Sequence, residues 1–203
     1  MNIKIMGWLL VFFSVLTWSA IEPADRLTWW MEVIPALIGV VVLVMTRERF
    51  PLTSLCYFLI LVHAVILMVG GHYTYAEVPI GDWLREFNGG DRNNYDKLGH
   101  LAQGFIPVII AREIMIRNHV VQKTGWLTFL LLCIVLALSA FYELVEWWAA
   151  LLSAEAAESF LGTQGYVWDT QSDMLWALCG AIVSLLLLSQ KHDRQIKELC
   201  GKD

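Results

Sequence analysis

Six apolar stretches, each close to the length of a membrane span, dominate the sequence. About 20 apolar residues cross the ~30 Å hydrocarbon core of a bilayer as an α-helix, because the backbone must satisfy its own hydrogen bonds there. The composition agrees, since 58% of the residues are hydrophobic and the mean hydropathy is +0.58. We therefore expect an all-α fold, a polytopic bundle of six transmembrane helices within a single integral-membrane domain over residues 1–203. The spans are expected at about 4–21, 28–45, 52–70, 97–116, 126–148 and 170–189.

Lys and Arg are distributed unevenly between the two sides of this bundle. With the N-terminus inside, ten of the 14 Lys and Arg residues lie on the inner side and four on the outer side. Because short cytoplasmic loops carry the excess of positive charge, both termini are expected in the cytoplasm. The first stretch is expected to remain as a helix, since Trp18 disrupts the small-residue pattern of a signal-peptide cleavage site. An aromatic belt at the outer headgroup level is expected from Trp18, Trp29, Trp30, Trp147, Trp148 and Trp168.

Net charge and cysteine spacing exclude some classes of function. The chain has 14 Lys and Arg against 19 Asp and Glu, a net charge of -5, so no basic face is available to bind nucleic acid. No pair of cysteines has the Cys-x-x-Cys spacing of a redox or zinc site, and none falls in an outer loop. We expect small packing residues without disulfides at Cys56, Cys133, Cys179 and Cys200.

The long outer loop, residues 71–95, contains an amphipathic segment. Asp82 is a candidate N-cap, and Trp83, Leu84 and Phe87 would form an apolar edge behind it. The segment predicts either a short helix at the membrane interface or an irregular loop anchored by Trp83.

Ionisable residues near the outer ends of the last three spans are the most informative feature. Such a residue costs about 2.5 to 3.5 kcal/mol in hydrocarbon, so its presence usually marks function. Spacings of three or four residues place the members of each group on one helix face. At about 1.5 Å of rise per residue, each lies within roughly 10 Å of the outer end of its helix. The groups are Asp96 and His100 with the neutral amide of Gln103 on the same face, then Glu143 and Glu146, then Asp169 and Asp173.

Other polar residues are candidates for a site at the same depth in the membrane. Glu32 precedes Pro35 by three residues, where a kink or a freed carbonyl is expected. His72 lies at the right depth as a charge partner. His63 is nine residues away, half a turn out of phase, and is expected to be packed or hydrogen-bonded elsewhere in the bundle. Arg92 precedes the fourth span and is a candidate cation.

Carboxylates at such close quarters cannot all be ionised without a cation between them. A bound metal ion, shared protons or the Arg92 guanidinium would each supply the balance. An oxygen-rich site with one imidazole suits Mg, Mn, Ca or iron better than structural zinc, so the possible cofactor is a divalent cation. A His among carboxylates is also suited to acid–base catalysis. The candidate catalytic residues are His100, Asp96, Glu143 and Glu146; the candidate metal ligands are Asp169, Asp173, Glu146 and His100; the candidate substrate or charge partners are Arg92, Gln103, His72 and Glu32.

Three long motifs carry a family resemblance: residues 92–105, 142–148 and 162–174. With these motifs the chain closely resembles the YjdF-like family of bacterial inner-membrane proteins. The resemblance implies a multi-pass protein of the cytoplasmic membrane and no assigned activity. A remoter similarity, over spans four to six, links Asp96, His100, Glu143 and Asp173 to VanZ-like membrane proteins, which are associated with glycopeptide resistance and the cell envelope. Residues 168–171 depart from that pattern.

Three functions compete. We favour an enzyme that acts on an envelope or lipid-linked substrate at the outer leaflet, because the polar cluster is shallow enough for a headgroup to enter. The alternative is a non-catalytic membrane protein whose polar cluster locks spans four to six together. A transporter is less favoured, since the pattern shows neither midplane charges nor paired repeats with broken helices, and the inner halves of spans four to six read as plain apolar helix.

Overall fold

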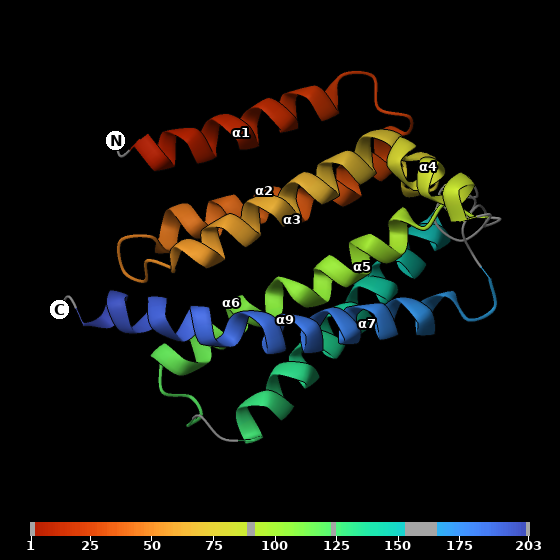
Figure 1. Ribbon diagram of the computed structural model, residues 1–203. Coiled ribbons are helices and arrows are strands. Elements are labelled where there is room, and N and C mark those ends of the chain that lie inside the picture. Colours follow the sequence, from red (N-terminus) through yellow and green to blue (C-terminus); the bar gives the residue numbers. More distant parts are fainter. Residues whose placement is uncertain (1–2, 89–91, 123–124, 153–165, 202–203) are drawn as a thin grey trace.

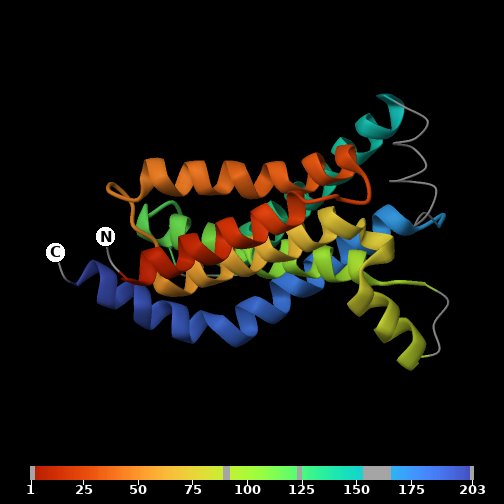
Figure 2. The ribbon, with the colours of Figure 1, turned by 90° about the horizontal axis from the view of Figure 1, so that it is seen from above.

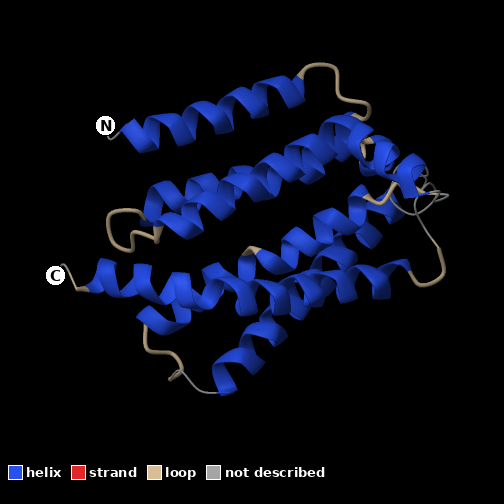
Figure 3. Cartoon of the chain, viewed as in Figure 1, coloured by secondary structure: helices blue, strands red, loops and turns tan. Residues whose placement is uncertain are grey.

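The computed structural model describes residues 3–88, 92–122, 125–152 and 166–201, and these residues form helices and no strands (Figure 3). Both termini lie at one end of the bundle, which we call the terminal end (Figure 1). The opposite end, the cavity end, carries the short helix α4. The helices are α1 (Ile3–Ala20), α2 (Arg26–Thr46), α3 (Ser54–Tyr73), the 3-10 turn η1 (Tyr75–Glu77), α4 (Pro79–Asn88), α5 (Tyr95–Phe105), α6 (Pro107–Arg117), α7 (Gly125–Leu152) and α9 (Asp169–Cys200).

Among the described residues, five segments are long and apolar enough to cross a membrane: α2, α3, the α5–α6 pair, α7 and α9. The helix α1 is a shorter apolar helix that packs on α3. The predicted all-α, multi-pass fold is therefore confirmed. Which side of the membrane each end faces stays a prediction.

The fourth span is two helices, where the sequence predicted one. α5 ends at Phe105, and α6 begins at Pro107. Proline has no N–H to donate to the carbonyl four residues earlier, and its ring crowds that carbonyl, so the helix is interrupted. Ile106 bridges the two pieces and donates its N–H to the Ala102 carbonyl at 2.9 Å. The break removes one argument against a transporter, because broken helices are frequent in that class.

The backbones of α5 and α9 approach each other closely through small residues. A Cβ atom on Gly104 would overlap the carbonyl oxygen of Ala177, and one on Gly180 would overlap the carbonyl oxygen of Leu101. Ala177 and Ala181 are fully buried in the same contact. Glycine and alanine allow such contact between membrane helices because no side chain separates the backbones. This packing fixes which faces of α5 and α9 oppose each other.

The aromatic-belt prediction is wrong for Trp29. Its side chain is buried, and its indole N–H donates to Ser19 Oγ at 3.1 Å, joining α2 to α1. Trp30, Trp147 and Trp168 are exposed at the cavity end, as a belt requires. An indole on the inward face of α2 packs into the core, because burying its large apolar area outweighs a position among headgroups.

The amphipathic segment of the outer loop is helical, which excludes the irregular alternative. Helix α4 begins at Pro79, so the prediction of Asp82 as N-cap is wrong: Asp82 lies in the first turn and pairs with Arg85 at 3.4 Å. Trp83 and Phe87 are exposed and stacked, with ring centroids 5.9 Å apart. The side chain of Leu84 lies outside the described residues. Figure 2 shows α4, in yellow-green at the lower right, projecting from the bundle.

Candidate functional site

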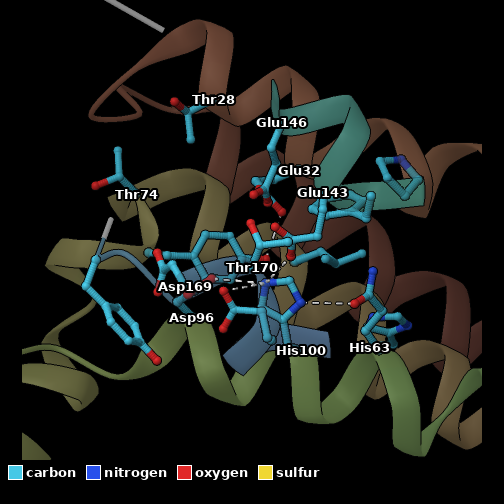
Figure 4. Close-up of a pocket in the computed structure, with 18 of the residues that line it drawn as sticks. Thr28, Glu32, His63, Thr74, Asp96, His100, Glu143, Glu146, Asp169 and Thr170 are labelled. Atoms are coloured by element: carbon cyan, nitrogen blue, oxygen red, sulfur yellow. Dashed lines mark hydrogen bonds and ion pairs between the residues drawn. The ribbon is translucent and has the colours of Figure 1, made fainter. Parts of the chain in front are cut away.

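A cavity of about 500 Å³ opens at the cavity end, between α2, α3, η1, α5, α7 and α9 (Figure 4). The imidazole ring of His100 is part of its lining, and carboxyl groups converge on the cavity from different helices. These are Glu32 from α2, Asp96 from α5, Glu143 and Glu146 from α7, and Asp169 and Asp173 from α9.

The buried ring of His100 lies between one amide and three acids. Its Nδ1 is 3.1 Å from Oε1 of Gln103, one turn along α5. Because a carboxamide oxygen can only accept, Nδ1 carries a proton and donates it. The other nitrogen, Nε2, faces the cavity, where it is 3.4 Å from Asp96, 3.9 Å from Glu143 and 4.0 Å from Asp173.

This arrangement offers Nε2 either a proton or a metal ion. Ligand atoms around a cation with bonds near 2.1 Å are separated by roughly 3 to 3.5 Å, close to the distances around Nε2. One oxygen each from Asp96 and Asp173, with a ring nitrogen of His100, lie within 4.8 Å of one another. A metal-bound His normally donates its second N–H to a fixed acceptor, which is what Gln103 supplies. The residues therefore fit a divalent cation.

Two carboxylate oxygens in the cavity need a partner. Oδ1 of Asp173 and Oε1 of Glu143 are buried and have no hydrogen-bond partner among the described residues. The Asp173 side chain is only 5% exposed. Buried polar atoms are seldom left without a partner, because each costs about 1 to 3 kcal/mol. The two oxygens point to a ligand or a proton that completes the site.

Tyr75 binds the carboxylate of Glu32, and two glycines leave room for the Tyr75 ring. The Tyr75 hydroxyl donates to Oε2 of Glu32 at 2.7 Å. The ring of Tyr75 lies against α3 and α5, where a Cβ on Gly70 or Gly99 would come within 2.6 or 2.8 Å of it. Burial, and then the neighbouring Glu32 charge, raise the pKa of Tyr75 well above its usual value, so the hydroxyl stays protonated and donates.

Arg92 forms ion pairs with two of the acids that line the cavity. Its guanidinium contacts both oxygens of Asp169, at 3.1 and 3.4 Å, and lies 3.8 Å from Asp96. It also sits over the ring of Tyr166 at 5.5 Å. Arg92 therefore pairs mainly with Asp169 and more distantly with Asp96, and its single charge cannot balance the remaining acids of the cavity.

The structure brings most of the candidate residues together. His100, Gln103 and the acids named above line the cavity, and Arg92 lies at its side. His72 does not reach it: its Nδ1 contacts the Ser19 carbonyl oxygen at 3.1 Å, and its ring packs on Trp18. His63, expected elsewhere, lines the cavity instead. The sequence assigned His72 to the site because of its depth in the membrane. The rotation of α3 about its own axis, set by packing against its neighbours, decides which histidine faces the site.

Sequence reasoning missed several polar lining residues. Tyr142 is four residues before Glu146, and Thr170 is three before Asp173, so helical spacing would have found both. Tyr75 carries no such signal, because it comes from a turn between helices. The part of the third family motif within residues 162–165 lies outside the described residues.

A second buried polar cluster lies at the terminal end, where the sequence predicted plain apolar helix. Glu113 of α6 accepts from Thr53 Oγ1 at 2.7 Å, from Arg117 at 2.9 Å and from Nε2 of His192 at 2.9 Å. The thiol of Cys56 also donates to it, at 3.0 Å, so Cys56 is more than a packing residue. Helix α9 extends to Cys200 and buries His192 completely. These predictions fail because charged ends of neighbouring helices meet and are hydrogen-bonded there.

The second cluster is a hydrogen-bonded lock rather than a metal site. Nη1 of Arg112 lies 3.1 Å from Nδ1 of His192. A guanidinium can only donate, so Nδ1 accepts and the ring proton is on Nε2, directed at Glu113. A metal would need the Nε2 lone pair and would force an N–H on Nδ1 against Arg112. The lock joins α3, α6 and α9.

Comparison with known proteins places the chain in a family. The family described as "Predicted membrane protein (DUF2238)" matches residues 4–194. The chain belongs to this family. The inner membrane protein YjdF of Escherichia coli (strain K12) is 51% identical over 183 residues, which cover 90% of this chain and 88% of that protein. No solved structure matches the chain. The resemblance to the YjdF-like family is confirmed; these findings do not test the similarity to VanZ-like proteins, which stays a prediction.

Proposed function

We propose that the cavity is the active centre of an enzyme that binds a divalent cation and acts on an envelope or lipid-linked substrate at the outer leaflet. The observation that carries the proposal is the orientation of His100. Nδ1 donates its proton to Gln103, so Nε2 is the nitrogen that faces Asp96 at 3.4 Å and Asp173 at 4.0 Å and that would bind the cation. Glu143 lies on the same side at 3.9 Å.

Charge balance supports the cation. The cavity is lined by six carboxyl groups, and the cationic partners among the described residues are Arg92 and, if protonated, His100. At about 5 Å two negative charges repel by roughly 3 kcal/mol at an effective dielectric of ~20. A bound cation would relieve this repulsion and polarise a phosphoryl or carbonyl oxygen of the substrate. Glu143 and Glu146 are then placed to accept a proton from an attacking group.

Metal content tests the centre directly. Detergent-purified wild-type protein should retain a divalent cation by elemental analysis and bind Mn²⁺ in calorimetry. The substitutions His100→Ala and Asp173→Asn should each weaken Mn²⁺ binding by at least about tenfold. Asp82→Asn, a matched change in an exposed pair, should leave it unchanged. Equal metal content in wild type and His100→Ala would contradict the centre.

Activity tests the reaction class. Phosphatase, esterase and transferase assays on lipid substrates should show turnover that His100→Ala and Glu146→Gln abolish. Turnover that survives both substitutions would exclude these residues from catalysis.

A second candidate, a purely structural lock, fits the same distances if His100 is protonated and paired with its three acids. The metal centre and the structural lock predict opposite changes in melting temperature for Asp173→Asn. In the proposed centre Asp173→Asn removes a surplus negative charge, so the melting temperature of the metal-free protein should rise and its stabilisation by Mn²⁺ should disappear. In a lock the same substitution lowers the melting temperature, with Mn²⁺ having no effect on either protein.

A further inference from the structure

A second cavity, of about 460 Å³, lies among α2, α3 and α6. Three residues, Pro35, His63 and Leu67, line both this groove and the acid-rich cavity. The two spaces therefore adjoin midway along the bundle, on either side of these three residues. One has acids on its walls, and the other continues from it toward the terminal end.

The walls of the groove are hydrocarbon over nearly their whole length. Val42 and Leu43 of α2 face Ile110 and Ile114 of α6. The Thr46 hydroxyl, also in the lining, already donates to the Val42 carbonyl at 2.7 Å. A headgroup would lose its hydration here without replacement, whereas an alkyl chain would bury its surface at about 25 cal/mol per Å².

The length of the groove suits one hydrocarbon chain. Pro35 and Thr46 are 11 residues apart on α2, which is about 16 Å of helix, roughly half of the ~30 Å hydrocarbon core. Thr28, in the acid-rich cavity, adds about 10 Å at the other end. Together the two cavities follow α2 through most of the membrane. A headgroup at the acids would place its chain in the groove.

We propose that the groove holds the hydrocarbon chain of an amphipathic lipid whose headgroup occupies the acid-rich cavity. The inference rests on the proposed function and names its substrate class: a lipid with a chain that passes the midplane beside α2. The acid-rich cavity adjoins the groove at Pro35, His63 and Leu67, so the lipid would lie with its headgroup toward the cavity end.

Gly39 allows the groove to be filled without disturbing the helix packing. It lines the groove, and a Cβ at this position would meet no atom within 4 Å. Phenylalanine at position 39 would therefore project into the space that the chain needs. Gly7 of α1 has the same open surroundings and does not line the groove, so Gly7→Phe is the matched control.

The test uses protein in nanodiscs of phosphatidylethanolamine and phosphatidylglycerol with Mn²⁺ present. One probe is phosphatidylglycerol with a diazirine at the end of an acyl chain, and the other has the diazirine beside the glycerol. After photolysis the chain-end probe should label Leu43, Ile110 and Ile114, and the glycerol probe should label Tyr75 and Tyr142. In Gly39→Phe the groove adducts should fall about tenfold, and in Gly7→Phe they should be unchanged.

Two results would overturn the inference. One is equal groove labelling in wild type and Gly39→Phe. The other is labelling at Thr46 and Asn118 by the glycerol probe, which would place the headgroup at the terminal end. Mn²⁺ calorimetry on the same proteins separates the two proposals. Groove labelling without Mn²⁺ binding supports the chain site and contradicts the metal centre, and Mn²⁺ binding without groove labelling does the reverse.

Discussion

The Nδ1 atoms of His100 and His192 have opposite hydrogen-bonding roles. His100 donates from Nδ1 to Gln103, and His192 accepts at Nδ1 from Arg112. Nε2 of each histidine faces a carboxylate, but only in His100 does the proton on Nδ1 leave Nε2 open to a metal ion or a second proton. The residues that differ are the partners of Nδ1. At the residue scale these partners decide which cluster can take a metal.

Gln103 should therefore control cation affinity without being a ligand. Gln103→Leu removes the acceptor for the Nδ1 proton, so Mn²⁺ affinity measured by calorimetry should fall about 10- to 100-fold. Gln103→Glu keeps an acceptor and should preserve the affinity. If Gln103→Leu binds Mn²⁺ as tightly as wild type, the orienting role is wrong.

Glu113 should matter for stability and not for metal binding. Glu113→Gln leaves Arg117 without its carboxylate and disrupts the bonds from Thr53 and His192, which should lower the unfolding free energy by about 3 to 5 kcal/mol. Denaturant titration in detergent measures this, with the exposed Glu198→Gln as control. A Mn²⁺-dependent melting temperature that disappears in Glu113→Gln would show that the second cluster binds metal after all.

At the scale of elements, the contact between α5 and α9 holds both halves of the proposed centre. His100 comes from one helix and Asp173 from the other, and the two backbones touch at Gly104 and Gly180. Any residue with a side chain would push the helices apart. The site geometry therefore depends on glycines that do not line the cavity.

Gly104→Ala should accordingly reduce both stability and cation affinity. Its Cβ would overlap the Ala177 carbonyl oxygen, and the backbone cannot yield cheaply, so a loss of about 1 to 3 kcal/mol is expected. Gly7→Ala, in open surroundings and outside both cavities, is the control and should lower neither the melting temperature nor the Mn²⁺ affinity. Unaltered stability in Gly104→Ala would mean that the two helices are not in backbone contact.

At the scale of the whole molecule, the two polar clusters lie at opposite ends of the bundle. The acid-rich cavity opens at the end that carries α4, and the lock lies at the end where both termini emerge (Figure 1). The surplus of Lys and Arg on the terminal side predicts that this side is cytoplasmic. The cavity would then open toward the periplasm.

Thiol labelling of intact cells tests this orientation. A membrane-impermeant maleimide should not label wild-type protein until the cells are opened, when the exposed Cys200 reacts. Glu77→Cys, at an exposed position of η1, should be labelled from outside. If Cys200 is labelled in intact cells and Glu77→Cys is not, the protein has the opposite orientation to the predicted one.

Short-range patterns determined the elements and the faces within them. Apolar length predicted the spans, because a bilayer admits only segments that satisfy their own hydrogen bonds. Helical spacing predicted that Asp96, His100 and Gln103 share a face, since neighbours three and four residues apart lie side by side on any helix. Pro107 was visible in the sequence, but whether a proline breaks or merely kinks a span depends on its neighbours.

Only the tertiary structure decided which faces meet. Tyr75 and Glu32 are 43 positions apart, and His192 and Glu113 are 79 apart, so no local spacing connects them. The rotation of each helix about its axis depends on packing between helices. That rotation turned His63 toward the cavity and His72 away from it. Sequence periodicity describes one helix at a time, whereas a site built from several helices depends on how their surfaces fit together.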